Sequence, residues 1–351
     1  MYLVAEGERE PWNHLVEQSP TGSLPQMWEW SCLHQLGPMF RLAVADDDGA
    51  YLACAVMLEQ QVPVSHQKLL YVPRGPVCDD PASPALALLV EGMRDLARRR
   101  QCFAMRVEPH VAHDDHAWRN ALRGLSFQPN RYAIFPRRSW ILDIHPAQDK
   151  LLAGMNKTCR YSIKRAQREG VQIRQGISER DRADFYAIYQ ETAQRHGFAI
   201  FPRAHYDEVL EAFLPQGKGM LFLADYGGKP IAAAVITVCG TVATYLYGAS
   251  ADHERQVMPN HLIQWTAIQW AKAQGCTYYD FRAVAENLTP TDDLYGLYIF
   301  KHGFGGASEF CLESYDLAIN PAVYRLYRWG VHLKRTYHDY RRQRRLTAAS
   351  E

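Results

Sequence analysis

The chain repeats one order of strands and helix, and this duplication constrains its fold more than any other feature. Each copy is predicted to contain a strand hairpin, a third strand, an amphipathic helix and a closing strand. The first copy has strands at 40–45, 51–61, 68–72 and 102–107 and a helix at 84–100. The second copy has strands at 220–225, 230–239, 242–247 and 276–281 and a helix at 260–274. Two such units predict an α/β protein with mixed sheets covered by helices, unless two ordinary segments share this order by coincidence.

Local signals set the expected ends of these elements. Asn260 is the predicted N-cap of the helix in the second copy, and Gly275 is the residue expected to end it. Cys102 and Cys276 are predicted to begin equivalent closing strands. A further helix is expected over 151–169, ahead of the second copy.

The length of 351 residues is enough for two domains, each with its own core. The segment from Glu313 onward fits neither copy and is expected to form a strand and then a helix, Pro321–Tyr340, that pack back on the first domain. We therefore expect the first domain to comprise residues 1–142 with 312–351, and the second to comprise residues 143–311.

Charge and composition exclude several classes of protein. Lys and Arg total 39 and Asp and Glu total 38, so the net charge of +1 excludes a uniformly basic nucleic-acid coat protein. No stretch approaches the roughly 18 apolar residues of a membrane span. The N-terminus MYLVAEGEREPW is acidic where a signal peptide is basic, so a cytoplasmic location is expected. The eight cysteines show no C-x-x-C pair and no zinc spacing, so we expect no metal site.

Residues 155–169 predict a helix with two contrasting faces. The face expected toward the core consists of Met155, Cys159, Ile163 and Ala166. The opposite one, called the basic face below, consists of Lys157, Arg160, Lys164 and Arg168. Like charges at these spacings repel one another, so helix stability does not explain them. Either RNA phosphates or solvent would surround this face.

A second basic run extends from residue 325 to 345, with eight Lys and Arg, one acid, and interleaved Tyr and Trp. This mixture suits RNA, through phosphate contacts and base stacking. It also suits a helix lying on anionic lipid headgroups. A C-terminal helix with a frayed polar end is the third alternative.

Seven segments, in this order along the chain, resemble the Fem peptidyltransferases, or FemABX family. They are LPQMWEW (24–30), YVPRGPV (71–77), MNKTCRYSIKRAQREGV (155–171), ETAQRHGF (191–198), YLYGAS (245–250), GCTYYDF (275–281) and YIFKHGFGG (298–306). The last segment, taken with the preceding YDF, is the most specific. Some family members carry a coiled-coil arm. This chain has no sustained heptad segment, so it resembles the armless, FemX-like type.

The resemblance implies both a fold and a reaction. The family fold is two tandem acyltransferase domains of the GNAT type, the first binding the acceptor and the second holding the aminoacyl donor. The implied reaction moves an amino acid from aminoacyl-tRNA to an amine of UDP-MurNAc-pentapeptide or lipid II, in peptidoglycan biosynthesis. The implied partners are charged tRNA and the precursor, with contact at the inner membrane surface and without a cofactor.

The resemblance also implies the residues that carry the chemistry. Amide formation passes through a tetrahedral oxyanion. Lys301, in the strand-to-loop segment YIFKHGF, is expected to face the aminoacyl ester, with Phe300 beside it. Without the resemblance, Lys301 would be read as an ordinary lysine at a strand edge. The general base stays open, because the family implies substrate-assisted proton transfer.

Further residues occupy positions that the resemblance assigns to the acceptor site. They are Trp30, His34, Arg74, Glu108, Arg203, Tyr206 and Tyr247. Glu108 could hold an ammonium or merely begin a turn with Pro109, and Arg74 in YVPRGP looks structural as much as binding. The family pattern Q-S-x-x-W-x-x-x-K is matched at Gln26 and Trp30, but its lysine is replaced by His34. Since this lysine contacts the diphosphate of the acceptor in the family, the usual acceptor is in question.

Three rival functions stay open. An acyl-CoA N-acyltransferase would need a glycine loop before a helix, but RQVMPN at 255–260 lacks both glycines, and Pro259 removes an amide donor. A second rival uses aminoacyl-tRNA to modify a natural product or an envelope polysaccharide. A third is a non-catalytic RNA- or membrane-binding protein, against which the retained Phe300 and Lys301 argue.

Overall fold

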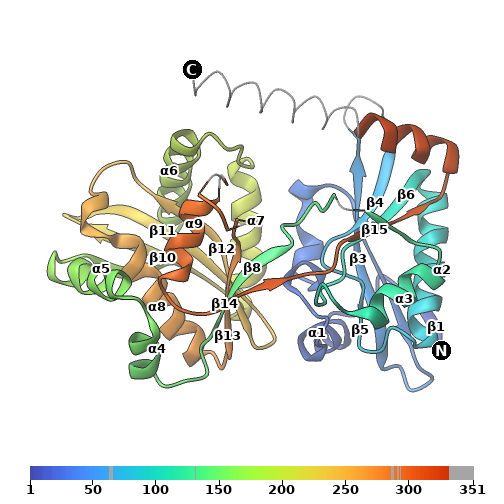
Figure 1. The fold of residues 1–351 in the computed structure, drawn as a ribbon, viewed down its shortest axis with the longest axis horizontal. Helices are drawn as coiled ribbons and strands as arrows, with labels where there is room; N and C mark the ends of the chain where they lie inside the picture. Colours follow the sequence, from blue (N-terminus) through green and yellow to red (C-terminus); the bar gives the residue numbers. More distant parts are fainter. Residues whose placement is uncertain (63–65, 131, 286–287, 291, 293, 332–351) are drawn as a thin grey trace.

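The computed structural model describes residues 1–62, 66–130, 132–285, 288–290, 292 and 294–331. These residues form two mixed sheets that lie side by side, each covered by helices (Figure 1). The predicted α/β class with mixed sheets is therefore confirmed. None of the described helices is long and apolar enough to cross a lipid bilayer.

The first sheet has the strand order β1–β2–β3–β4–β6–β15–β7, with the short β5 beside β3. Its strands are β1 (Tyr2–Ala5), β2 (Met39–Ala45), β3 (Tyr51–Gln61), β4 (Lys68–Val72), β5 (Val77–Cys78), β6 (Cys102–Val107), β7 (Gln128–Asn130) and β15 (Ser314–Ala318). The helices of this half are α1 (Arg9–Gln18), α2 (Pro84–Arg99) and α3 (His116–Gly124). The hydroxyl of Ser83 accepts a hydrogen bond from the Ala85 amide and caps α2, whose apolar face packs on the sheet.

The second sheet has the order β14–β8–β13–β12–β11–β10–β9. Its strands are β8 (Arg138–Asp143), β9 (Gln172–Gly176), β10 (Gly219–Tyr226), β11 (Lys229–Cys239), β12 (Val242–Ser250), β13 (Tyr278–Ala283) and β14 (Ala307–Phe310). Its helices are α4 (Gln148–Gly154), α5 (Lys157–Arg168), α6 (Glu179–His196), α7 (Arg203–Phe213), α8 (Pro259–Ala273) and α9 (Tyr295–His302).

The predicted duplication is present in both halves. In the first, β2, β3 and β4 form an antiparallel meander, and α2 then crosses to β6, which pairs in parallel with β4. In the second, β10, β11 and β12 form the same meander, and α8 crosses to β13, which pairs in parallel with β12. A crossover helix between neighbouring parallel strands is what the predicted units require.

Several element ends differ from the prediction. Helix α8 begins at Pro259, and its N-cap is Met258 with φ 58°, so Asn260 lies inside the first turn rather than at the cap. Strand β13 begins at Tyr278 instead of Cys276. The helix expected over 151–169 is two helices, because the Asn156 side chain accepts a hydrogen bond from the Cys159 amide (2.7 Å) and starts α5 afresh.

The chain changes sheets earlier than the predicted limit between residues 142 and 143. Strand β8 pairs with β13 and β14 and therefore belongs wholly to the second sheet. After β14 the chain returns, and β15 enters the first sheet between β6 and β7. We propose a domain division along these lines, with the first domain ending before β8 and resuming after β14.

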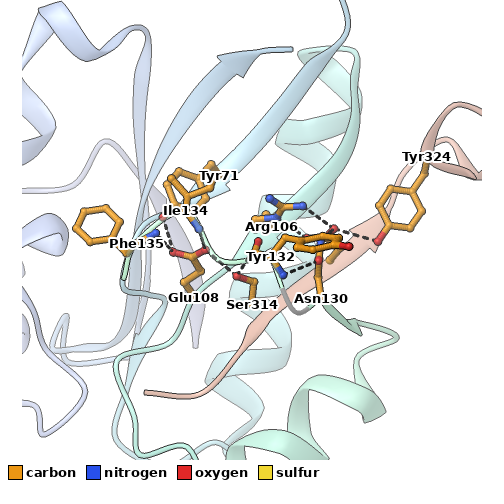
Figure 2. A network of polar contacts seen from close by, with 10 residues as sticks. Tyr71, Arg106, Glu108, Asn130, Tyr132, Ile134, Phe135, Ser314 and Tyr324 are labelled. Carbon is orange, nitrogen blue, oxygen red and sulfur yellow. Dashed lines mark hydrogen bonds and ion pairs between the residues drawn. The ribbon is translucent and has the colours of Figure 1, made fainter. Parts of the chain in front are cut away.

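A buried polar network holds the returning strand β15 in place (Figure 2). The Arg106 guanidinium donates to both oxygens of Asp316, at 2.7 and 2.9 Å. Asn130 and the Tyr324 hydroxyl also donate to Asp316, at 2.7 and 3.0 Å. Tyr324 belongs to the C-terminal helix, which spans residues 321–331 in the described part of the chain. The Tyr324 ring packs against Phe103 of β6. The rest of the predicted helix Pro321–Tyr340 lies outside the described residues.

An apolar cluster joins the two halves of the molecule. It combines buried side chains of the first half, among them Trp12 and Trp30, with Val209, Phe213 and Leu246 of the second. Because protein interiors are close-packed, this shared cluster holds the facing ends of the two sheets in one arrangement. The groups described next lie at that junction.

Candidate active site

A cleft lies between the two halves, and both sheets supply its walls. Arg74, His110 and Phe135 line it from the first half, and Asp280, Arg282 and Ala283 line it from the second. The guanidinium groups of Arg74 and Arg282 both lie near the Phe135 ring, at 5.7 and 5.8 Å from its centroid. The cleft therefore combines two cations, one carboxylate and one imidazole.

The cleft forms where parallel strands separate. Strands β12 and β13 pair only as far as Thr244 and Asp280. Beyond that point, Arg282 adopts a left-handed backbone conformation (φ 62°), and its Nη1 donates to the Leu246 carbonyl at 3.1 Å. The last pair of β4 and β6 is likewise Val72 and Val107. Strand ends that separate in this way leave room for side chains and a substrate between them.

Lys301 lies on α9 and is almost completely buried, with 5% of its surface exposed. Its Nζ donates a hydrogen bond of 2.6 Å to the carbonyl oxygen of Ala283, a residue of the cleft wall. Burial lowers the pKa of Lys301 to about 8, and the carboxylate of Asp280 opposes this shift. The expected strand-to-loop setting of Lys301 is wrong, because the segment is helical, and the lysine is neither at a strand edge nor exposed.

Phe300 lies beside Lys301 and is half-buried. Its ring centroid is 5.0 Å from that of His261, in the first turn of α8, and 5.4 Å from that of Phe304. Burial lowers the pKa of His261 to about 4, so the imidazole is neutral at physiological pH. Phe300 therefore links α9 to α8 through aromatic contacts and fixes the helix that carries Lys301.

Glu108 has no free acceptor site for a substrate ammonium (Figure 2). One carboxylate oxygen accepts from the Tyr71 hydroxyl (2.5 Å) and the Phe135 amide (3.1 Å). The other accepts from the Ile134 amide (2.7 Å) and the Ser314 hydroxyl (2.7 Å). Of the two alternatives left open by the sequence, the contacts favour a structural one: the carboxylate ties β6 to residues 134–135 and to β15.

The tyrosines expected to bind the acceptor meet at one place. The ring centroids of Tyr206 and Tyr247 lie 4.9 Å apart. The Tyr247 hydroxyl lies 2.8 Å from Nε2 of His205, a buried histidine whose pKa burial lowers to about 4. Arg203 begins α7 but forms ion pairs with Glu179 and Asp207.

The first-half residues of the expected acceptor site divide into two groups. Trp30 is buried and lines the cleft, whereas His34 is exposed and lines a separate hollow with Arg41. Helix α7 reaches the His34 segment, because Glu208 accepts a hydrogen bond from the Gln35 amide at 3.0 Å. The structure thus brings Trp30 to the same cleft as Arg74, and His34 to the edge of the second half.

The YVPRGP segment is held by a buried glutamine. The Gln26 amide group donates to the Pro73 carbonyl (2.6 Å) and accepts from the Val56 amide (2.8 Å). A Cβ on Gly75 would lie 2.5 Å from the Gln26 side chain, so this position requires glycine. Arg74 donates to the Pro136 carbonyl at 2.6 Å. These contacts place Arg74 at the cleft and give Gln26 a structural role.

Two family models match most of the chain. Residues 8–135 match the model of the FemAB family, and residues 153–291 match that of an acetyltransferase (GNAT) domain. The lipid II:glycine glycyltransferase of Staphylococcus saprophyticus is 24% identical, over 89% of this chain and 92% of its own. The UDP-N-acetylmuramoylpentapeptide-lysine N(6)-alanyltransferase of Weissella viridescens is 27% identical, over 90% of this chain and 95% of its own. The chain belongs to the FemAB family.

Solved structures agree with the fold of this FemAB-family chain. A crystal structure of FemX superposes with a TM-score of 0.85 at 21% identity, covering 93% of this chain and 99% of that one. A tandem GNAT protein from the clavulanic acid biosynthesis pathway superposes with a TM-score of 0.57 at 11% identity, over 91% and 99%. The predicted pair of tandem GNAT-like domains is confirmed, and the chain is an aminoacyltransferase.

The loop before α8 of this FemAB-family chain is a poor phosphate-binding loop. Met258 and Glu254 both have positive φ, at 58° and 56°, so the backbone turns sharply there without glycine. Pro259 follows as the first residue of α8 and offers no N–H. Side chains therefore occupy positions where a bare backbone would approach a pyrophosphate.

The basic face is mostly open to solvent. Lys157, Lys164 and Arg168 are exposed, whereas Arg160 is half-buried and donates to the carbonyls of Ala153 and Met155. The four residues expected on the core side of this helix are all buried, which confirms its predicted amphipathic character. Three of the four basic side chains thus remain available to an anionic partner, while Arg160 ties α5 to α4.

Sequence reasoning missed several residues of the cleft. Asp280 lies inside the segment GCTYYDF and Arg282 follows it by two residues, but no local pattern marks either side chain as functional. His110 follows the strand that ends at Val107 by three residues, a position where functional side chains are common. Only the approach of the two sheets places these three residues in one cleft with Arg74.

Proposed function

We propose that the protein transfers an amino acid from aminoacyl-tRNA to an amine of a peptidoglycan precursor peptide, forming an amide. The observation that carries this proposal is the buried Lys301 ammonium, which donates a hydrogen bond to the Ala283 carbonyl at the cleft wall. It occurs in a chain matched over nine-tenths of its length by a lipid II:glycine glycyltransferase and a UDP-N-acetylmuramoylpentapeptide-lysine alanyltransferase. The proposed acceptors are accordingly UDP-MurNAc-pentapeptide and lipid II.

The chemistry follows from the groups around the cleft. The amine nitrogen of the acceptor attacks the ester carbonyl carbon, and negative charge develops on the carbonyl oxygen. A desolvated ammonium stabilises that oxyanion far more than it would in water, because burial reduces the local dielectric. Lys301 is the charged group that we assign to this role. Phe300 keeps the helix that carries it in place.

We propose that the two halves divide the substrates between them. The acceptor would enter the cleft from the first half, past Trp30 and Arg74, with Tyr206 and Tyr247 of the second half contacting its peptide. The aminoacyl end of the tRNA would reach Lys301 from the second half. The exposed cations of the basic face would then contact tRNA phosphates, which dominate the affinity of proteins for nucleic acids.

The location of the reaction follows from its donor. Charged tRNA is present where translation occurs, so we propose a cytoplasmic reaction. A lipid-linked acceptor would bring the enzyme to the inner membrane surface. The exposed Leu326 and Trp329 lie on the C-terminal helix together with Arg325 and Arg328, a combination suited to an anionic lipid interface.

The test is a transfer assay with both substrates varied. The enzyme is incubated with a mixture of charged tRNAs and with UDP-MurNAc-pentapeptide or lipid II, and products are read by mass spectrometry. We expect the acceptor mass to increase by one amino-acid residue. Absence of any product with either precursor, from enzyme that binds charged tRNA, would refute the assignment of the acceptor.

One observation favours a second candidate acceptor. The residue in place of the family's phosphate-binding lysine is the exposed imidazole of His34. An acceptor without a diphosphate, such as a natural product or an envelope polysaccharide carrying an amine, would not need a permanent cation there. The same assay with amines that lack a nucleotide distinguishes the two acceptors.

A further inference from the structure

His110 is the one titratable ring on the described walls of the cleft. Its Nδ1 lies 3.0 Å from the carbonyl oxygen of Gly22. A carbonyl can only accept a hydrogen bond, so Nδ1 carries the proton. In the neutral ring Nε2 then holds a lone pair. Among the described residues, no group hydrogen-bonds to Nε2, so this atom is left for a substrate.

The surroundings keep the His110 ring neutral. Burial and the nearby Arg74 guanidinium lower the pKa of His110. The hydrogen bond to Gly22 and the carboxylate of Asp280 raise it, but the net shift is downward. The remaining charged group on the cleft wall is Arg282, a second cation. Glu108 lies two residues earlier, but its carboxylate is occupied by four donors of the protein itself. A neutral imidazole with a fixed tautomer is therefore present at physiological pH.

Asp280 supplies the complementary charge on the opposite wall. One of its oxygens accepts a hydrogen bond from the Arg282 amide at 2.6 Å. Within the described part of the chain, no lysine or arginine forms an ion pair with it. Asp280 also acts electrostatically on both Lys301 and His110. An unpaired carboxylate near both groups is suited to hold a substrate ammonium between the imidazole and the buried lysine.

We propose that His110, held by Gly22 and facing Asp280, is the base that removes the proton from the acceptor's ammonium before amide formation. This inference rests on the proposed function and assigns a role that the resemblance left to the substrate alone. It also defines the acceptor's reactive end as a primary ammonium, held by Asp280. His110 would contact the reacting nitrogen and is thus assigned as a catalytic residue.

The proton balance of the step is complete with the groups present. The ammonium gives its first proton to Nε2 of His110, which passes it to water. The freed nitrogen forms the C–N bond to the ester carbonyl carbon, while Lys301 stabilises the oxyanion. As the C–O bond to the ribose breaks, the second proton moves from nitrogen to the leaving ribose oxygen. The third proton remains on the amide nitrogen.

The variant His110→Asn tests this role. The asparagine amide can still donate to the Gly22 carbonyl, but it has no basic nitrogen. We expect a loss of about a hundredfold in transfer at pH 7, within the range for removal of a general base. The loss should shrink about tenfold per pH unit as pH rises, since free acceptor amine then forms in solution. Lys301 titrates in both proteins, so its effect cancels in the wild-type to variant ratio.

A second variant and a control complete the test. His110→Ala leaves space at the ring, and added imidazole should restore transfer several-fold in this variant but not in wild type. His113→Asn changes an exposed histidine of the same loop and should leave the rate unchanged. Melting temperatures establish that each variant is folded.

The outcomes separate this inference from the proposed function. A constant wild-type to His110→Asn ratio at every pH, with no rescue of His110→Ala by imidazole, would show that His110 only supports the cleft. Equal rates for wild type and His110→Asn would also overturn the inference. If wild type itself transfers nothing to any precursor amine, the proposed function fails instead.

Discussion

Replacing Lys301 by methionine removes the charge that we assign to the oxyanion and nearly preserves the side-chain length. The lysine is 5% exposed, and its Nζ donates to the Ala283 carbonyl at 2.6 Å. A charged group in this position can act on the reaction, on the stability of the fold, or on both. The structure allows the two effects to be estimated separately.

The effect on stability should be small because two terms oppose each other. Burial lowers the pKa of Lys301 from 10.5 to about 8, so keeping the charge in the folded state costs about 3 kcal/mol, which methionine recovers. Methionine also leaves the Ala283 carbonyl without its donor, at a cost of about 1–3 kcal/mol. The two terms nearly cancel, so the melting temperature should change by only a few degrees.

The effect on transfer should be large. Loss of an oxyanion partner reduces the chemical step by about a hundredfold or more, on the order of 3 kcal/mol. Binding of tRNA should change little, because one charge is a small part of many phosphate contacts. Lys301→Arg should also lose activity, since a planar guanidinium does not fit a tight ammonium site.

The pH dependence of Lys301 has a defined sign in both rate and stability. The Lys301 ammonium loses its proton as the pH rises past its pKa of about 8, so the rate of transfer by wild type should fall above that pH. Between about pH 8 and 10.5 the unfolded chain binds this proton and the folded chain does not. The stability of wild type relative to Lys301→Met should therefore rise with pH across that window, and below it the difference should be constant.

The assay is single-turnover transfer from charged tRNA, with urea unfolding at several pH values. Lys272→Met is the matched control, because its Nζ also donates to backbone carbonyls, those of Ile144 and His145, away from the cleft. The control should transfer at the wild-type rate. Folded Lys301→Met that transfers as fast as wild type would refute the assignment of Lys301.

Three further predictions follow from other parts of the structure. Neutralising the three exposed members of the basic face should reduce the slope of log affinity for tRNA against log salt concentration by about 2 to 3. Binding titrations at several salt concentrations measure this slope. An unchanged slope would mean that only solvent surrounds the basic face. Asp316→Asn leaves Arg106 buried without its counter-charge and should cost about 3–5 kcal/mol in urea unfolding, whereas Asp95→Asn in an exposed pair should cost under about 1 kcal/mol. Titration calorimetry with acetyl-CoA should show no binding, because Pro259 at the start of α8 has no backbone N–H to donate to a pyrophosphate. A heat of binding that is abolished by competition with CoA would contradict this prediction.

Much of the architecture could be predicted from the sequence because its signals are local. The continuous apolar runs of β3 and β11 indicate buried strands, and the apolar stripe of α2 indicates a helix that packs on a sheet, from local sequence alone. The duplicated order then predicts the meander and crossover of both halves. Element ends were less predictable: a methionine with positive φ, rather than Asn260, caps α8, and no propensity indicates that conformation.

The site was predictable only in part, because its groups come from distant segments. The ordered motifs pointed to Lys301, but its helical setting and its bond to Ala283 depend on how α9 packs against the end of β13. The sequence is compatible with two roles for Glu108. Only the tertiary structure shows that β15 and residues 134–135 donate hydrogen bonds to its carboxylate oxygens.

The cleft itself was decided by tertiary structure. His110 and Asp280 are far apart along the chain and carry no joint pattern, so no periodicity links them. They approach because one apolar cluster, shared by the two halves, packs the halves against each other beside the cleft. Local sequence determines which residues form strands and helices. The packing of one sheet against the other determines which polar side chains meet, and burial there lowers the pKa values of His110 and Lys301.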